Sequence, residues 1–219
     1  MKAFVTSRAI ALSLLVLGGV FGIATSYSQA TAFSPVHLQE TGPPVFETQR
    51  YFPPGVLSSN EWQDRFKASW YSRALAAMNE PSLSLPQRPQ TETYRFLWLR
   101  SFDNPIVVRV WRSESKVYSV TKQLDGDGGH HPGKLVVNKT RSLSNKEWAE
   151  LAKHLEQSSY WTLPTDIADI GNDGAQWVLE GAREGRYHIV DRWSPKNDSY
   201  RRACSYLLEL SGLKLGKMY

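Results

Sequence analysis

The sequence predicts an α+β fold: a single domain in which an antiparallel β-meander and a β-hairpin pack with three α-helices. Short segments rich in β-branched and aromatic residues follow one another across tight turns, which is typical of antiparallel strands. Three other segments carry apolar residues at helical spacing behind helix-capping residues. With 219 residues, of which 41% are hydrophobic, the chain is long enough for one domain with a substantial core.

Residues 1–32 predict a secretory signal peptide. Lys2 and Arg8 form its basic start, an apolar run without charge covers residues 9–24, and Ala30-Thr31-Ala32 fits the small-residue pattern of a cleavage site. The alternative is an uncleaved helix over residues 9–27 that anchors the chain in the inner membrane. Glycines within the apolar run weaken such a helix. We therefore expect cleavage and export, to the periplasm or out of the cell.

Residues 33–57 contain two Pro-Pro pairs and should form an extended Pro-rich linker, or an arm that lies on the domain. We expect the α+β domain itself over residues 58–216. Its first helix should begin at Ser58, which has capping-box spacing to Glu61. Apolar residues then recur every three or four positions and predict a stripe that faces the core: Trp62, Phe66, Trp70, Ala74 and Ala77.

Four strands should follow as the meander, then a second helix, the hairpin and a last helix. The meander strands are expected at residues 93–102, 106–112, 115–124 and 133–140, and the hairpin at 175–182 and 186–193. We expect the helices to cover one face of the sheet.

The last two helices carry the clearest local signals. Ser144 and Glu147 have capping-box spacing, and Gly212 is a natural end for the last helix. Cys204, the only cysteine, lies on the apolar face of that helix, so we expect a buried thiol.

The charge of the chain narrows the range of partners. The formal net charge is +5, and loss of Lys2 and Arg8 with the signal peptide leaves +3. The basic residues do not cluster, so we expect no nucleic-acid partner. A membrane contact is expected only if the N-terminal segment is not cleaved.

Several blocks resemble an uncharacterised family of exported bacterial proteins, a domain of unknown function. These blocks are WYSRALAAMNEPSL (70–83), YRFLWLRSFDNPIVVRV (94–110), DGAQWVLEG (173–181) and YHIVDRWSP (187–195). The GKL after the Gly-rich loop and the closing LLELSGL are similar as well. The resemblance implies an exported bacterial protein of one domain, and it implies no activity, cofactor or catalytic residue.

The segment QLDGDGGHHPGKL, residues 123–135, is the first candidate for chemistry. Its carboxylates Asp125 and Asp127 and its imidazoles His130 and His131 are ligand types that transition metals accept. An EF-hand is excluded because, counted from Asp125, position 6 is a histidine and position 12 is a valine. No further ligand is evident, so we interpret the segment as a glycine-rich turn between two strands and expect no cofactor.

The hairpin is the second candidate. If strand alternation brings Glu180 to the same face as His188 and Arg192, these side chains form a polar strip suited to acid–base chemistry or ligand binding. We favour the alternative of a solvated face with cross-strand pairs. Asp191 belongs to the other, mainly apolar face, and would need a partner such as an arginine if it is buried.

The eight tryptophans are the third candidate, because aromatic platforms stack on sugars. Trp62, Trp70, Trp148 and Trp177 lie on expected core faces, where packing explains them. The other four tryptophans are less constrained, so a glycan stays open as a ligand: Trp98, Trp111, Trp161 and Trp193.

The sequence lacks the common short motifs of hydrolases, zinc proteases, phosphate-binding loops and redox dithiols. We therefore expect a non-enzymatic binding or interaction protein of the cell envelope, with an envelope protein or a glycan as partner. The alternative is a hydrolase-type enzyme that uses the His188 strip or the histidine loop. An enzyme should bring one of these histidines to a carboxylate, whereas a binding module should expose an aromatic patch.

Overall fold

The computed structural model describes residues 51–86, 91–129, 131–167, 171, 173–216 and 218. They belong to one compact unit, residues 45–219. None of the helices among these residues is long and apolar enough to cross a membrane. The expected signal peptide, and the expected linker up to residue 50, lie outside the described residues.

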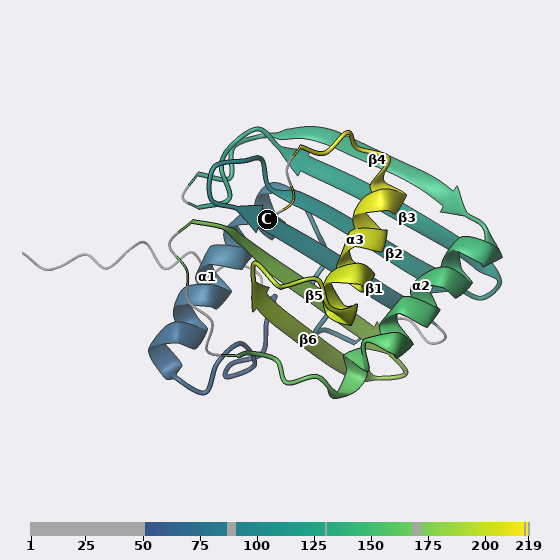
Figure 1. The fold of residues 1–219 in the computed structure, drawn as a ribbon, viewed down its shortest axis with the longest axis horizontal. Coiled ribbons are helices and arrows are strands. Elements are labelled where there is room, and N and C mark those ends of the chain that lie inside the picture. The colour runs from purple at the N-terminus through teal and green to yellow at the C-terminus, as the bar shows by residue number, and fades with distance from the viewer. Residues whose placement is uncertain are drawn as a thin grey trace, which may run out of the picture. The chain divides into compact units, whose positions relative to one another are not determined.

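A six-stranded antiparallel sheet with the strand order β4-β3-β2-β1-β5-β6 forms the centre of the fold (Figure 1). The strands are β1 (Thr91–Arg100), β2 (Ile106–Ser113), β3 (Lys116–Leu124), β4 (Leu135–Leu143), β5 (Ala175–Arg183) and β6 (Arg186–Trp193). The first four form the predicted meander. The β5–β6 hairpin joins the same sheet because β5 pairs with β1, placing Leu179 opposite Phe96. The predicted α+β class is confirmed.

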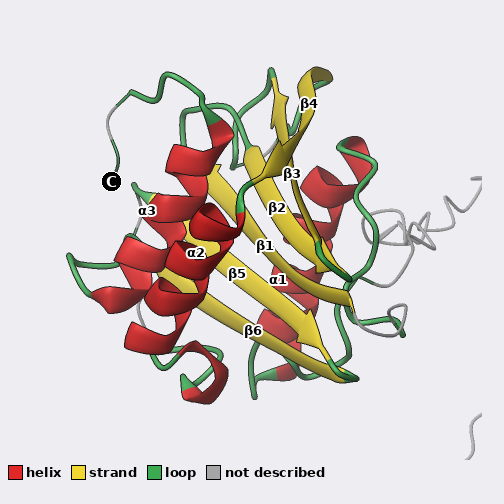
Figure 2. Ribbon diagram, turned by 90° about the vertical axis from the view of Figure 1, so that its right-hand side faces the viewer, coloured by secondary structure: helices red, strands yellow, loops and turns green. Residues whose placement is uncertain are grey.

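Helices cover both faces of the sheet (Figure 2), so the expectation of one covered face is wrong. The helices α2 (Asn145–Gln157) and α3 (Ser199–Ser211) lie on one face, and α1 (Glu61–Ala77) lies on the other. The reason is visible in β1, where Phe96 packs towards α2 and α3 while Leu97, its neighbour, packs into the core beside α1. A strand that is apolar on both sides needs cover on both sides.

The ends of α2 and α3 agree with the sequence prediction. Ser144 caps α2 and forms the expected capping box with Glu147. Asp198 caps α3, and Gly212 ends it in the left-handed conformation with a φ of 65°. Cys204 is buried, as expected. A short 3₁₀ helix, Tyr160–Thr162, follows α2 and was not anticipated.

The N-terminal end of α1 differs from the prediction. Asn60, not Ser58, is the cap, and its side chain accepts a hydrogen bond from the backbone N–H of Gln63 at 3.0 Å. Residues 51–60, the N-terminal strap, are packed rather than linker, since Tyr51, Phe52 and Leu57 are all buried. Residues 51–57 therefore agree with the expected alternative of an arm that lies on the domain, and the domain begins before residue 58.

Asp64 fixes this strap to the first turns of α1. Its carboxylate accepts hydrogen bonds from the backbone N–H groups of Gly55 and Leu57, each at 2.8 Å. A carboxylate that accepts backbone N–H bonds near a helix N-terminus is stabilised by the helix dipole as well. The strap and α1 thus form one unit on this face of the sheet.

The capping box of α2 predicts an acid-dependent contribution to stability. The carboxylate of Glu147 accepts a hydrogen bond from the backbone N–H of Ser144 and pairs with Arg141, and these contacts lower its pKa to about 2. Because the folded-state pKa is depressed, the stabilisation is present above the unfolded pKa and is lost as the pH falls towards 2. Glu147→Gln should lower the free energy of unfolding by about 0.5–1 kcal/mol at pH 7 and by less at pH 3.

Urea denaturation at the two pH values measures this difference. Glu156→Gln is the matched control, because Glu156 is exposed on the same helix and its side chain forms no hydrogen bond or ion pair with another described residue. A loss of stability in Glu147→Gln that is equal at pH 7 and pH 3 would contradict the role of the ionised carboxylate.

Candidate ligand-binding groove

The Gly-rich loop between β3 and β4 uses its carboxylates to bind its own backbone. Asp125 accepts a hydrogen bond from the N–H of Lys134 at 2.6 Å, and Asp127 accepts from those of Gly129 at 3.1 Å and His131 at 3.3 Å. His131 is exposed, and His130 lies outside the described residues. Within the described ranges, no three His, Cys, Asp or Glu side chains gather as metal ligands would. The loop is a turn between two strands, as the sequence interpretation has it.

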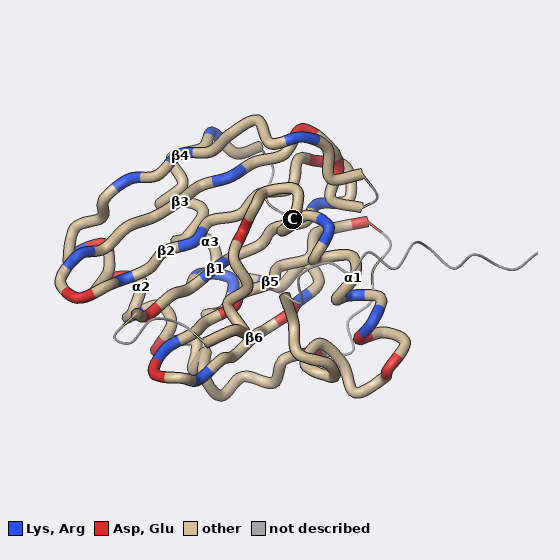
Figure 3. Tube along the Cα trace, turned by 180° about the vertical axis from the view of Figure 1, so that it is seen from behind, with Lys and Arg blue, Asp and Glu red and all other residues tan. Residues whose placement is uncertain are grey.

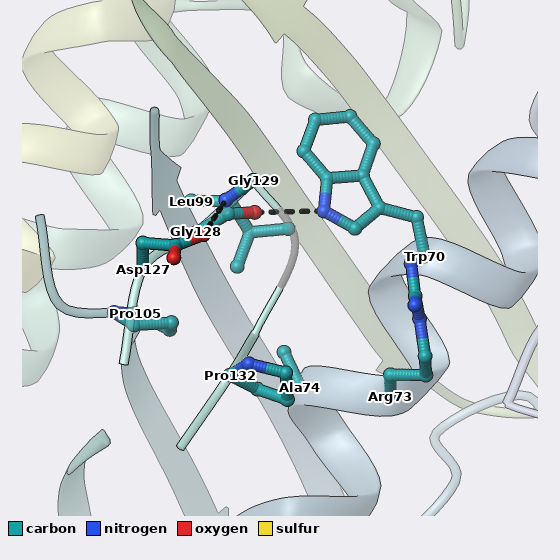
Figure 4. A pocket seen from close by; sticks show the side chains of 9 residues that line it. All are labelled: Trp70, Arg73, Ala74, Leu99, Pro105, Asp127, Gly128, Gly129 and Pro132. Atoms are coloured by element: carbon teal, nitrogen blue, oxygen red, sulfur yellow. Dashed lines mark hydrogen bonds between the residues drawn. The ribbon is translucent and has the colours of Figure 1, made fainter. Parts of the chain in front are cut away.

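Trp70 of α1 holds this loop in place (Figure 4). Its indole Nε1–H donates to the carbonyl of Gly128 at 2.7 Å, and the N–H of Gly128 donates to the carbonyl of Arg100 at 3.0 Å. A side chain at position 128 would collide with the backbone of Arg100, so this close approach requires glycine. The crevice beside the indole measures about 10 Å³, which is too small for a ligand larger than water.

The predicted polar strip of His188, Glu180 and Arg192 does not form. The register of the hairpin places Glu180 opposite Ile189, so Glu180 shares the α1 face with the odd-numbered residues of β6. His188 and Arg192 are even-numbered and point to the opposite face, towards α2 and α3. The prediction assumed that even-numbered residues of both strands share a face, but the two-residue turn at 184–185 pairs even with odd positions.

His188 lies among aromatic rings instead of meeting a carboxylate. Its ring centroid is 5.1 Å from that of Tyr160 and 6.1 Å from that of Trp161. Its Nε2 is buried without a hydrogen-bond partner among the described residues, and burial lowers the pKa of the imidazole. The arrangement that an acid–base histidine requires is therefore missing around His188 in the described part of the chain.

Arg192 shapes the loop that follows α2. Its guanidinium donates to the carbonyls of Pro164 and Thr165 at 2.7 and 2.8 Å. The backbone N–H of Asp191 also donates to the carbonyl of Thr165, at 2.7 Å. The loop is thereby fixed along the outer edge of β6.

Glu180 belongs to a buried ion network beneath the end of α1. Arg95 binds it through two nitrogens, Nε and Nη2, at 2.7 and 2.8 Å, and both side chains are fully buried. Glu80, which follows α1, lies in the same network, 2.7 Å from Arg109 and 2.8 Å from Lys122. Basic and acidic residues therefore occur on the strands of the sheet as well as in the surface loops (Figure 3).

Asp191 is fully buried, and its cationic partner is a lysine rather than the arginine suggested by the sequence. The Nζ of Lys67 lies 3.0 Å from its carboxylate, and the hydroxyl of Tyr71 donates to it at 2.9 Å. The side-chain amide of Gln176 donates as well. Burial raises the pKa of Asp191, an effect that Lys67, Gln176 and Tyr71 offset in part. Lys67 also binds Asp166 at 2.9 Å, which ties α1 to the loop after α2.

A groove of about 1050 Å³ opens beside this cluster, lined by the strap, α1, the β1–β2 turn, the β3–β4 loop, the loop before β5, the start of β5 and the end of β6. Lys67, Asp166 and Gln176 line it and connect its surface to the buried Asp191. Its remaining lining is largely aromatic or small and polar.

Exposed apolar side chains concentrate in this groove. Of the seven large hydrophobic residues that are most exposed among the described residues, four line it: Trp62 (66%), Phe66 (50%), Phe102 (75%) and Ile167 (44%). The rings of Trp62 and Phe66 are parallel within 5°, with centroids 5.5 Å apart. A gathering of exposed apolar groups within a concave surface is the kind of place where ligands bind, so the groove is a candidate binding site.

The sequence identified these aromatic residues but assigned them to the wrong environment. Trp62 and Phe66 were expected on the core stripe, whereas the buried face of α1 carries Tyr71 and Leu75. A polar residue marks the face of α1 that packs on the sheet. Lys67 lies at helical spacing from the buried Tyr71, and its amine pairs with the buried carboxylate of Asp191. Trp148 and Trp177 are buried as predicted, and Trp98 is buried too.

Comparisons with known proteins do not add to this picture. No protein-family model, curated protein or solved structure matches the chain. The functional inference therefore rests on the groove itself.

The buried ion network predicts that two arginines differ strongly in how much they contribute to the free energy of unfolding. Arg95→Met should lower the free energy of unfolding by about 3–5 kcal/mol, because Glu180 would stay buried without its cation. Arg65→Met is the matched control, since Arg65 pairs with Glu61 on the exposed surface of α1 at 2.8 Å and should cost less than about 1 kcal/mol. Chemical denaturation measures both variants, and equal losses would contradict the network as described.

Proposed function

We propose that the chain is an exported, non-enzymatic binding protein of the bacterial cell envelope, and that its ligand binds in the aromatic groove beside α1. The observation that carries this proposal is the exposed, parallel pair of Trp62 and Phe66 on the wall of a groove of about 1050 Å³. Ligand sites are concave, mostly apolar and about 300–1,000 Å³ in volume, with a few convergent polar groups. The groove has this composition, and its volume lies just above this size range.

The state of the polar groups in the groove favours binding over catalysis. Burial alone would lower the pKa of Lys67, but the carboxylates of Asp191 and Asp166 raise it, so the amine stays protonated and is a poor base or nucleophile. Asp191 is enclosed by Tyr71 and Gln176 as well as by Lys67. Each of these groups already has a structural partner.

Export is supported by the N-terminal pattern of residues 1–32 and by the resemblance to exported bacterial proteins. The chain is also suited to an oxidising compartment. Its single thiol, Cys204, is buried, and burial raises its pKa, which suppresses the reactive thiolate. The core, rather than a disulfide, stabilises the domain.

The groove should bind an uncharged apolar dye in the native state. Nile red, whose emission rises in apolar surroundings, should bind the native protein saturably, and Trp62→Ala/Phe66→Ala should weaken this binding about tenfold or more. Fluorescence titration measures the affinity. Val136→Ala is the matched control, because Val136 is 56% exposed on β4 and does not line the groove. Dye binding that is unchanged in the double variant would contradict a functional groove.

The mature protein should begin at or near residue 33. Expression of the full chain in a bacterium, followed by intact mass measurement of the periplasmic fraction, should give a mass that lacks residues 1–32, because the signal peptidase cleaves after small residues. A full-length mass in the membrane fraction would instead establish the anchor over residues 9–27.

A further inference from the structure

We infer that the groove binds an uncharged oligosaccharide. This inference rests on the proposed binding function and specifies its ligand class. It follows from the faces of the aromatic rings, the unused hydrogen-bonding groups, the charge and the size of the groove.

The rings of Trp62 and Phe66 stack on one another, and both side chains remain exposed to the groove. Trp62 and Phe66 lie one helical turn apart on α1, and their rings are parallel within 5°. Trp70 continues the series at 5.9 Å from Phe66, but with a tilt of 46° and with its indole N–H given to Gly128. The C–H face of a pyranose ring is flat and apolar, and it stacks on such a surface with its hydroxyl groups pointing sideways.

Polar groups with spare hydrogen-bonding capacity line the same groove. Gln63 accepts from the hydroxyl of Ser58 at 3.1 Å through its Oε1, and its amide N–H₂ donates to no other described residue. Gln176 donates its amide to Asp191, and its carbonyl oxygen accepts from no described residue. Asp173 is exposed and forms no ion pair within the described part.

These groups separate a sugar from a purely apolar ligand. An acyl chain in the groove would bury the free donor of Gln63 and the free acceptor of Gln176 without partners, at a cost of about 1–3 kcal/mol each. Sugar hydroxyls donate and accept, so they satisfy both groups. A ligand with an apolar face and a hydroxylated rim therefore fits better than a hydrocarbon.

The charge of the lining disfavours anions. The one cation that lines the groove among the described residues, Lys67, is neutralised by Asp166 and Asp191. Asp173 adds an uncompensated negative charge. Phosphorylated, sulfated or uronic ligands would thus meet repulsion rather than a binding partner.

The shape of the site disfavours an added peptide strand. Peptides often bind by extending a sheet at a free edge. Along β6 this edge is taken at Asp191, whose N–H is already bonded to Thr165 at 2.7 Å.

The size of the groove bears on the length of the ligand. A volume of about 1050 Å³ exceeds what a single small sugar would fill, which favours several sugar units.

Competition with bound Nile red tests the ligand class. The probes are three uncharged tetrasaccharides that differ in linkage and N-acetylation, namely cellotetraose, maltotetraose and chitotetraose, with tetragalacturonate as the anionic comparison. At least one uncharged tetrasaccharide should displace the dye and should bind better than tetragalacturonate. Direct calorimetric titration should show its Kd weakened about tenfold by Trp62→Ala and severalfold by Gln63→Ala. Val136→Ala should leave the Kd unchanged.

Three results would overturn the inference. If the dye binds the groove but none of the three tetrasaccharides displaces it, the ligand is not an uncharged glycan of this kind, although the binding function stands. If a synthetic peptide of residues 33–50 displaces the dye and the sugars do not, the groove is a peptide site. Preference for tetragalacturonate would contradict the charge argument. Failure of the dye itself to bind would contradict the proposed function instead.

Discussion

The carboxylate of Asp191 is the constraint on which the arrangement of this protein depends. It is fully buried on the edge strand β6, on the sheet face covered by α1, where an unpaired charge would be strongly destabilising. The amine of Lys67 and the hydroxyl of Tyr71 meet this need, and both come from α1. Because these residues are four positions apart, they fix the rotation of α1 about its own axis as well as its position.

The groove is a consequence of that rotation. Once Lys67 and Tyr71 face the sheet, Trp62 and Phe66 lie on the outward part of the helix. Asp64 then draws the strap against the first turn, and Asp166 brings the loop after α2 to the amine of Lys67. The need to pair the buried carboxylate of Asp191 thus leads to a concave surface with exposed aromatic rings.

The sequence predicts those parts of the fold that depend on neighbours in the chain. Ser144 and Glu147 are three residues apart, and Gly212 acts within one turn, so the capping box of α2 and the C-terminal end of α3 were predicted. The inward face of α1 depends on Asp191, which lies 120 residues beyond Tyr71. Apolar spacing alone placed Ala74 correctly in the core but also placed Trp62 and Phe66 there, which are exposed. The prediction of a polar strip at His188 was wrong because the hairpin turn pairs even-numbered positions of β5 with odd-numbered positions of β6.

The walls of the groove come from segments that are far apart in the chain: the strap and α1, the β1–β2 turn, the loop before β5, and the ends of β5 and β6. A molecule that touches several of these segments binds only the folded protein. Binding and folding are therefore thermodynamically linked, and a ligand at a hundred times its Kd would stabilise the native state by about 2.7 kcal/mol. For an exported protein of the kind that we propose, occupancy of the groove would itself extend the lifetime of the fold.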